Sequence, residues 1–379
     1  MAVSLTTIVQ SIATGLWQNT RVCRHIHNTA QTLIKSLAAL RAASPNGPRT
    51  ALRMTTDSPT DADPSSAQAE VPPPACVLSF NANDPSGAGG TGGDVATIAA
   101  MGAHPLPVVT SLLLRDTAEV FDQHAIDGDA IVDQARHVLE DAGVHAFKVG
   151  FLGTAENVSA VAEILSDYPE APLVAYLPNL SWMDDEEQRS SYLDAFRELI
   201  LPATAVLVGS QQALADFLLP DWDNERRPSA RELAVAAAEH GAEHVLVTGI
   251  LLPAAKGQPQ FMDNVLASAQ GAITGEKFEL FEVSFVGAGD TLSAALASLL
   301  AVGSDIPAAV GEALQFLDQS LDAGFRPGMG HVVPDRFFWA LPPEDEEGTD
   351  AGPEGGGPAP DDFNAPDQTI PPGGSRRVH

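Results

Sequence analysis

Short apolar runs alternate with stretches of helical periodicity through the middle of the chain. The runs are typical of strands and lie at Cys76–Phe80, Leu106–Leu114, His145–Gly150, Leu173–Leu177, Ala205–Val208 and Val245–Thr248. Apolar positions three and four residues apart predict helices at Asp94–Met101, Asp129–Ala142, Thr154–Asp167, Glu186–Ile200, Ser229–His240, Asp290–Ala301 and Ile306–Ala323. Two further strand-like pieces, Gln260–Leu266 and Lys277–Val283, precede the last two helices.

Local signals support these boundaries. Gly143 follows the helix at Asp129–Ala142 as a C-cap, and Ser229 and Glu232 have the spacing of a capping box. Repeated alternation of apolar strands with helices predicts an α/β fold with three α/β/α layers around a mostly parallel sheet. Ligands of such sheets bind beyond the carboxyl ends of the strands, where both glycine-rich turns of this chain fall.

The composition changes along the chain and predicts four parts. Residues 1–56 contain no Asp or Glu and carry several Arg, which is typical of an organellar transit peptide or, in the interpretation we favour, of a mis-called start ahead of Met54. Residues 57–75 are rich in Pro, Ser, Asp and Ala and indicate a linker. Residues 76–341 form the expected domain, and 342–379 the expected disordered acidic Pro/Gly tail.

The charge balance excludes several partners. A formal net charge of −30 argues against nucleic acid and anionic membranes, because both require basic patches. No run of about 18 apolar residues predicts a membrane span. Cys23 and Cys76 are the only cysteines, too few for a disulfide framework or a cysteine metal site, so we expect a reducing compartment, the cytoplasm.

The turn Gly287–Ala288–Gly289–Asp290 indicates chemistry, because it stands directly before an apolar helix. Backbone N–H groups at a helix start are unpaired and attract anions, and small side chains let a phosphate approach them. An aspartate beside such a cradle makes sense as the base for a hydroxyl that attacks the phosphate. The alternative interpretation is that Asp290 is simply the N-cap of the helix.

The earlier turn, Asn83–Asp94, contains a G-x-G-x-x-G pattern at Gly87, Gly89 and Gly92. This pattern is typical of dinucleotide-binding oxidoreductases, which place an acidic residue about 20 positions further on. Asp116 lies somewhat late for that role, and the pattern leaves the later turn unexplained. We therefore treat the oxidoreductase as the least favoured alternative.

Taken together, the two turns resemble the ribokinase-like superfamily, and within it the hydroxymethylpyrimidine/phosphomethylpyrimidine kinases of thiamine biosynthesis. The resemblance covers residues 76–335 and is carried by Asp84–Gly87 with Asp94, Met101–Ala103, Val109–Leu112 with Thr117, Lys148–Leu152 and Gly287–Ala295. It implies a ribokinase-like fold without the inserted lid of the sugar kinases, since Phe80 runs almost directly into the first glycine turn.

The resemblance also implies ATP, Mg²⁺ and a set of site residues. Asp290 would be the base, and the backbone of Gly287, Ala288 and Gly289 would hold the transferred phosphoryl group. The resemblance assigns substrate contacts to Asp94, Ala82 and Gly89, and a nucleotide contact to Thr248. Arg115 stands at the position of a family glutamine, and it would either bind an anion, such as a phosphate already on the substrate, or turn outward. Plain structural alternatives stand beside these roles: an N-cap for Asp94, turn geometry for Ala82 and Gly89, and a strand-end threonine for Thr248. Lys148 lies in an apolar strand and is expected to pair with a buried acid.

This chain departs from the family pattern at several positions. Arg115 stands where the family has a glutamine, and Ser210 and Ala213 stand where it has the Asn and Glu that organise metal and phosphates. No metal ligands can therefore be assigned. Asp290 replaces a cysteine of close relatives with the base of the wider superfamily.

The expected function is ATP-dependent phosphorylation of hydroxymethylpyrimidine, of its monophosphate, or of both, by a homodimer. A pyridoxal/pyridoxine-type vitamin kinase is the alternative among enzymes. A catalytically silent pyrimidine- or nucleotide-binding relative is the alternative outside them.

Overall fold

The computed structural model describes residues 73–254 and 257–340 of the chain. The expected extension at 1–56, residues 57–72 of the expected linker and the expected tail at 342–379 lie outside the described residues. Within the described ranges, no helix is long and apolar enough to span a membrane.

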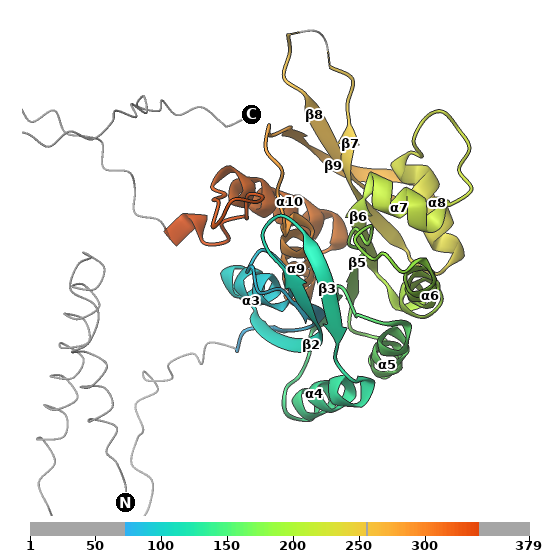
Figure 1. The fold of residues 1–379 in the computed structure, drawn as a ribbon, viewed down its shortest axis with the longest axis vertical. Coiled ribbons are helices and arrows are strands. Elements are labelled where there is room, and N and C mark those ends of the chain that lie inside the picture. Colours follow the sequence, from blue (N-terminus) through green and yellow to red (C-terminus); the bar gives the residue numbers. More distant parts are fainter. Residues whose placement is uncertain (1–72, 255–256, 341–379) are drawn as a thin grey trace, which may run out of the picture. The chain divides into compact units, whose positions relative to one another are not determined.

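All nine strands of the described residues belong to one sheet, ordered β3-β2-β1-β4-β5-β6-β7-β8-β9 (Figure 1). They are β1 (Cys76–Asn83), β2 (His104–Arg115), β3 (Val120–Ala125), β4 (Ala146–Val149), β5 (Leu173–Tyr176), β6 (Val206–Ser210), β7 (His244–Leu251), β8 (Phe261–Ser268) and β9 (Gly271–Glu279). The strands from β2 to β7 in this order pair in parallel, and β3, β8 and β9 are antiparallel at the two edges. The expected mostly parallel sheet is confirmed.

Helices cover both faces of the sheet. One face carries α3 (Gly90–Ala100), α9 (Ala288–Ala301) and α10 (Ile306–Asp322), and the other carries α4 (Gly128–Asp141), α5 (Ala155–Ser166), α6 (Glu186–Ala195), α7 (Gln211–Leu218) and α8 (Ala230–Glu239). Each helix layer shares a separate buried apolar cluster with the sheet. The three-layer α/β/α architecture is therefore confirmed.

Strand alternation decides which side chains face which layer, because successive side chains of a strand point to opposite faces. Leu78 and Phe80 of β1 join the cluster under α4–α8, whereas Val77 joins the cluster under α3, α9 and α10. Ser79 and Asn81 have the parity of Val77 and therefore point toward α3 and α9. Lys148 does the same in β4, since its neighbours Phe147 and Val149 face the other layer.

The carboxyl end of β1 is where the topology reverses. The chain passes from β1 to its neighbour β2 on one side and later returns to β4 on the other side. Open α/β sheets bind ligands outside the carboxyl ends of the strands at such a switch point. Helix α9 comes late in the sequence but packs against α3, β1, β4 and β5, so its first turn reaches this point.

Several expected boundaries differ from the structure. Strand β3 and helix α7 were not predicted: β3 is a short, half-polar edge strand, and α7 has only eight residues. The strand expected at Lys277–Val283 is β9, which begins earlier, at Gly271. Its start is hard to predict because the strand is exposed at the sheet edge and its polar residues mask the alternation. The helix expected at Glu186–Ile200 is an α-helix only over Glu186–Ala195, as α6, and a π-helical turn follows over Phe196–Ile200.

The expectation of a fold without a lid is confirmed. Six residues, 84–89, separate β1 from α3, which leaves no room for an inserted sheet. A C-terminal segment instead reaches the site region, since Phe285 bridges to Val332 and Phe325 bridges to Val333.

Candidate active site

A buried polar cluster interrupts the apolar layer between the sheet and helices α3 and α9. Its members are Ser79 and Asn81 of β1, Lys148 of β4, Asp94 of α3 and Asp290 of α9. Asn81 connects the two acids, because its Nδ2 donates to Asp94 Oδ2 at 3.0 Å and to Asp290 Oδ1 at 2.8 Å. Its Oδ1 accepts the backbone N–H groups of Ala82 and Phe151, which fixes the amide. The two aspartates that the sequence places 196 positions apart therefore meet at one amide.

The two oxygens of Asp290 have different surroundings. Oδ1 accepts from Lys148 Nζ at 2.7 Å and from Asn81. Oδ2 accepts one hydrogen bond, from the backbone N–H of Gly90 at 3.0 Å, so it keeps capacity for a further donor. Asp290 also lines the cavity, and its side chain is 16% exposed. Oδ2 is therefore the oxygen that can accept a proton or a hydrogen bond from a bound molecule.

The surroundings hold Asp290 in its charged form. Burial raises the pKa of a carboxyl group, but the Lys148 ammonium and the hydrogen bonds from Lys148, Gly90 and Asn81 outweigh this effect and bring the pKa of Asp290 below its usual value. At neutral pH the residue is an ionised, well-oriented acceptor.

Asp94 lies beneath the cavity and is not among its lining residues. Its side chain is fully buried and accepts hydrogen bonds from Ser79, Asn81 and Lys148. Burial is the largest effect on this group and, together with the nearby Asp290 charge, raises its pKa above the usual value despite Lys148. Asp94 is the fifth residue of α3, whose N-cap is Gly89, so the N-cap interpretation of Asp94 is wrong. The structure brings Asp94 to the site but not to the cavity wall.

The first glycine turn is organised by Asp84. One carboxylate oxygen accepts the N–H and hydroxyl of Ser86 at 2.9 and 2.6 Å, and the other accepts the N–H of Gly89 at 3.0 Å. Arg115, at the end of β2, forms an ion pair with the same carboxylate at 3.3 Å. The expected residues Ala82, Gly89 and Arg115 all line the cavity.

The second glycine turn begins α9. Gly287 is the N-cap, with a φ of +87°, and the first helical hydrogen bond runs from Thr291 N–H to its carbonyl. The N–H groups of Ala288, Gly289 and Asp290 thus precede the hydrogen-bonded ladder of the helix. Since Asp290 is the third helical residue and makes no capping bond, its interpretation as an N-cap is wrong.

Close approach explains why small residues occupy these turns. A Cβ on Gly287 would collide with the carbonyl of Ala88, and a Cβ on Gly289 would collide with the ring of Tyr176. A Cβ on Gly89 would lie 2.5 Å from Asp290 Oδ2 and would cover that oxygen. The two turns therefore pack against each other with Asp290 Oδ2 left accessible between them.

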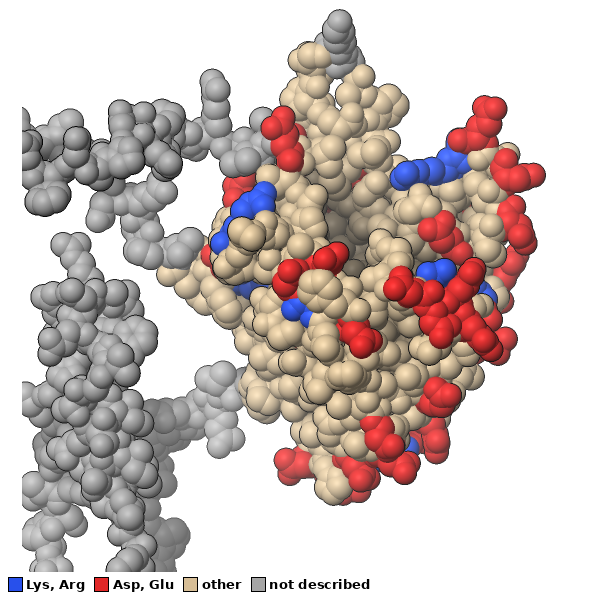
Figure 2. Space-filling view, in the orientation of Figure 1, with Lys and Arg blue, Asp and Glu red and all other residues tan. Residues whose placement is uncertain are grey.

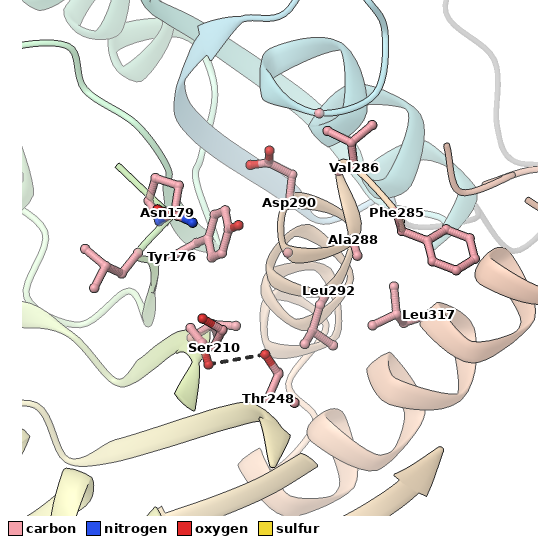
Figure 3. A pocket seen from close by; sticks show the side chains of 18 of the residues that line it. Tyr176, Asn179, Ser210, Thr248, Phe285, Val286, Ala288, Asp290, Leu292 and Leu317 are labelled. Atoms are coloured by element: carbon pink, nitrogen blue, oxygen red, sulfur yellow. Dashed lines mark hydrogen bonds between the residues drawn. The ribbon is translucent and has the colours of Figure 1, made fainter. Parts of the chain in front are cut away.

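A cavity of about 560 Å³ joins these parts. A hollow opens near the middle of the visible face in Figure 2, among surroundings rich in Asp and Glu. On the side of β1 and β2 the cavity is lined by Ala82, Gly89, Leu113, Arg115, Val120, Phe151 and Trp182; on the side of β7–β9 and α10 it is lined by Thr248, Met262, Phe278, Phe281, Leu292, Leu317 and Leu321. Asp290 and Ala288, in the first turn of α9, line the cavity as well (Figure 3).

Thr248 ends the parallel part of β7 and lines the second half of the cavity. Its hydroxyl donates to the carbonyl of Gly209 at 3.3 Å, the bond drawn in Figure 3. Ser210 is the N-cap of α7 and accepts the N–H of Ala213. The two positions of the missing Asn-x-x-Glu pair therefore lie at the start of a helix on the cavity rim, where they supply no carboxylate.

Tyr176 and Arg336, like Ser79 and Asn81 of the buried cluster, were not identified from the sequence. Tyr176, at the end of β5, lines the cavity and presents its ring to Lys148 Nζ at 5.7 Å from the centroid. Burial, followed by the Asp290 charge, raises its pKa, so the hydroxyl stays protonated. Arg336 is 5% exposed and donates to Thr291 Oγ1 at 3.1 Å and to the carbonyls of Gly87 and Ala88. No sequence pattern indicates Arg336, because its partners are Thr291 and backbone carbonyls of a segment far away along the chain.

Comparisons with known proteins agree with this geometry. A family described as phosphomethylpyrimidine kinase matches residues 84–335. The chain is 30% identical over 275 residues to a hydroxymethylpyrimidine/phosphomethylpyrimidine kinase of Streptomyces coelicolor, covering 72% of this chain and 98% of that protein.

Solved structures show the same fold. Bacillus subtilis pyridoxal kinase, solved with ADP, aligns with a TM-score of 0.62 at 21% identity over 71% of this chain and all of that one. Phosphomethylpyrimidine kinase of Clostridium difficile aligns with a TM-score of 0.52 at 20% identity, covering 64% of this chain and 97% of that one. The expected ribokinase-like fold is confirmed, and together with the sequence matches these findings show that the chain belongs to the phosphomethylpyrimidine kinase family.

Proposed function

We propose that this chain transfers the γ-phosphoryl group of ATP to the hydroxymethyl group of a pyrimidine, to the monophosphate of that pyrimidine, or to both. The observation that carries the proposal is the placement of Asp290: one oxygen faces the cavity, immediately beside the unpaired N–H groups at the start of α9. The family membership and the relatives named for this reaction support the same conclusion.

The two halves of the cavity suit the two reactants. The half near Thr248 is mostly apolar, which suits the adenine ring of a nucleotide, and leads to the N-terminus of α9, where the helix dipole favours phosphate. The half near Ala82 and Gly89 combines small residues with the aromatic rings of Phe151 and Trp182, which suits a flat heteroaromatic substrate. A hydroxymethyl group on that substrate would then approach Asp290.

In the proposed reaction, the substrate hydroxyl donates a hydrogen bond to Asp290 Oδ2 and its oxygen attacks the γ-phosphorus. The new O–P bond forms as the bond from that phosphorus to the β-phosphate bridging oxygen breaks, and ADP leaves with the bonding electrons. The hydroxyl proton passes to Oδ2 and then to water. Because the pKa of Asp290 is lowered, the proton moves late, once the attacking oxygen has become acidic. This order suits the loose transition state of phosphoryl transfer.

The N–H groups of Ala288, Gly289 and Asp290 are proposed to bind the transferred phosphoryl group. Such preorganised donors stabilise the charge that develops in the transition state and need no rearrangement when it forms. The hydroxyl of Tyr176 lines the cavity close to the same turn and is a further donor in this arrangement.

Mg²⁺ is expected with ATP, but the described residues do not build a site for it. No group of three or more His, Cys, Asp or Glu side chains with metal-binding geometry occurs in them. The carboxylate of Asp94 is enclosed and that of Asp84 is engaged by Ser86, Gly89 and Arg115. We therefore assign no side chain to the metal and derive no step from it.

The decisive test measures ADP release by the full-length chain with hydroxymethylpyrimidine, hydroxymethylpyrimidine phosphate, pyridoxal and pyridoxine offered separately. Turnover of either pyrimidine supports the proposal. Preferred turnover of pyridoxal or pyridoxine contradicts the substrate assignment, and binding of a pyrimidine without any turnover indicates the silent relative.

Asp290→Asn tests the base in the same assay. General-base groups contribute about 10² to 10⁴ in rate, so we expect a loss of that size in kcat with the dissociation constant of ATP nearly unchanged. A variant that keeps most of its kcat contradicts the assignment of Asp290.

We also propose that the reaction takes place in the cytoplasm, supported by the small number of cysteines. Fusion of residues 1–56 to a fluorescent protein tests the alternative of a transit peptide. Import of the fusion into an organelle contradicts the cytoplasmic proposal.

A further inference from the structure

The reaction described above gives no part to Lys148, a titratable side chain of the buried cluster. Its side chain is fully buried in the middle of β4, a strand whose other residues are apolar. Nζ lies 2.9 and 3.1 Å from the two oxygens of Asp94 and 2.7 Å from Asp290 Oδ1. An ammonium group has three N–H donors, and these three contacts use all of them. Lys148 therefore has no donor left for a ligand in the cavity.

The contacts of Lys148 fix the orientation of Asp290. Lys148 Nζ and Asn81 Nδ2 both hold Oδ1, on the side of the sheet, and the N–H of Gly90 holds Oδ2. With Oδ1 held from two directions, the carboxylate presents Oδ2 to the gap at Gly89, where the missing Cβ leaves room. Loss of the contact to Lys148 would free the carboxylate to rotate about its χ angles.

Charge balance gives Lys148 a second effect. Asp94 and Asp290 accept hydrogen bonds from the same Asn81 amide, so two like charges lie close together in a buried site. The other ionisable groups that face the cluster are Tyr176 of β5, which is neutral, and the Arg336 guanidinium, which donates to backbone carbonyls and Thr291. Lys148 is the cation in direct contact with both acids. Carboxylates that share a site without such a cation cannot both stay ionised.

We propose that Lys148 is a positioning residue of the phosphoryl transfer, which keeps the carboxylate of Asp290 ionised and turned toward the cavity, and that Asp94 is the buried counter-charge that holds Lys148 in place. This inference rests on the proposed function, because it assigns Lys148 a role through Asp290. It gives Asp94 a position behind the reacting groups instead of a contact with the substrate.

The test compares the pH dependence of kcat in Lys148→Met, Lys148→Gln and the double variant Asp94→Asn/Lys148→Met with that of the wild-type chain. Lys148→Met removes the charge and the donors, and Lys148→Gln keeps a donor without the charge. The double variant removes one carboxylate together with the ammonium and so restores the charge balance of the cluster, which guards against simple misfolding of the single variant. Lys277→Met, at an exposed position of β9 that does not line the cavity, is the matched control.

We expect Lys148→Met to lower kcat at least tenfold at neutral pH and to move the acid limb of the kcat profile upward by about one to three pH units, the range by which a neighbouring cation shifts an aspartate. Lys148→Gln should recover part of kcat but keep the shifted limb. The double variant should move the limb back toward that of the wild type, and Lys277→Met should match the wild type.

The inference is overturned if the acid limb of the kcat profile of Lys148→Met lies at the wild-type pH, whether kcat is high or low. It is also overturned if the acid limb of the double variant lies at the same pH as that of Lys148→Met. If Lys148→Met does not fold, the acid limb of the double variant decides. A limb at the wild-type position, with a kcat that Asp290→Asn abolishes, supports the inference. A limb above the wild-type position in the folded double variant overturns it. These outcomes differ from failure of the proposed function, in which Asp290→Asn itself retains activity.

Discussion

At the residue scale, the site depends on the absence of a side chain at Gly89, next to Asp290. Gly89 has a φ of −145°, outside the left-handed region that favours glycine, so φ alone does not require glycine at this position. The space beside it does, because a Cβ there would lie 2.5 Å from Asp290 Oδ2. The absence of one side chain thus opens the path to the proposed base.

We predict that Gly89→Ala lowers kcat by a factor of ten or more and also lowers the free energy of unfolding, because a Cβ 2.5 Å from Asp290 Oδ2 must displace a carboxylate that Lys148, Asn81 and Gly90 hold. Gly92→Ala is the control, since its Cβ would meet open space within α3. Gly92→Ala should keep wild-type kcat and gain up to about 1 kcal/mol of stability from helix propensity. Steady-state kinetics and urea unfolding of both variants measure this contrast, and equal kcat values would contradict it.

At this scale the sequence indicates residue types better than residue roles. The expectation that Lys148 pairs with a buried acid is confirmed, and it pairs with two. Asp94 and Asp290 were each weighed as helix N-caps, and both lie inside their helices. The cap assignment depends on where the turn ends, and Gly87–Gly93 offers several equivalent starts, so the sequence could not choose among them.

At the element scale, the helix starts are defined by local hydrogen bonds. Ser229 accepts the N–H of Glu232, and the Glu232 carboxylate accepts the N–H of Ser229, which forms the expected capping box of α8. The hydrogen bond from Arg226, followed by those from Ser229, lowers the pKa of Glu232 to about 2. The carboxylate is partly exposed, so its contribution is screened by water.

We predict that the stability from this capping box is present above the unfolded pKa of Glu232, about 4.3, and is lost as the pH falls from there toward 2. The sign follows because a lowered folded pKa means that the unfolded chain binds the proton first. Glu232→Gln should therefore be less stable than the wild type by about 1 kcal/mol or less at pH 7, and the difference should shrink between pH 5 and pH 3. Thermal unfolding of both proteins across this range measures it, and a difference independent of pH would rule out the ionised cap.

Strands buried on both faces were predictable from the sequence, and the strands at the sheet edges were predicted in part or not at all. Strands β4 and β5 are buried on both faces and, apart from Lys148, apolar, so they stand out in the sequence. Strands β3 and β9 lie at the sheet edges and expose many polar residues. Their existence depends on pairing with β2 and β8, which are partners that local pattern does not reveal.

At the scale of the whole molecule, Arg336 connects three distant segments. Its guanidinium donates to the carbonyls of the β1–α3 turn and to Thr291 of α9, and it belongs to the segment that follows the bridge between Phe285 and Val332. Burial lowers the pKa of Arg336, although the neighbouring carboxylates act in the opposite direction. The side chain holds the two glycine turns together from below.

We predict that Arg336→Met destabilises the chain by about 1–3 kcal/mol, because it leaves buried carbonyls without donors, and that it lowers kcat as the two turns separate. Arg231→Met, at an exposed position of α8, is the control and should change neither quantity. Denaturant unfolding and steady-state kinetics provide the measurements. A stable Arg336→Met variant with wild-type kcat would show that the turns hold their positions without this contact.

The expected homodimer stays a prediction. Leu112 and Leu114 of β2 are 42% and 41% exposed. Both side chains lie on the same face of the sheet, opposite to the face of the cavity-lining residues Leu113 and Arg115. Exposed apolar side chains that lie together are typical of an interface. We therefore expect the chain to be a dimer by light scattering and Leu114→Asp to make it a monomer, whereas Val302→Asp, at another exposed apolar position, should leave it dimeric. A monomeric wild-type chain contradicts the prediction.

The sequence by itself determined the layers and the positions of both glycine turns, and it indicated Asp290 as a candidate for the chemistry. These features depend on local physics: apolar periodicity sets strands and helices, and small residues before a helix leave its N–H groups free. Only the tertiary structure decided that Asn81, Lys148 and Asp94 surround Asp290 and that Arg336 joins the turns. These contacts join β1, β4, α3, α9 and the C-terminal segment, and which strands become neighbours and which faces oppose each other is fixed when the whole sheet assembles.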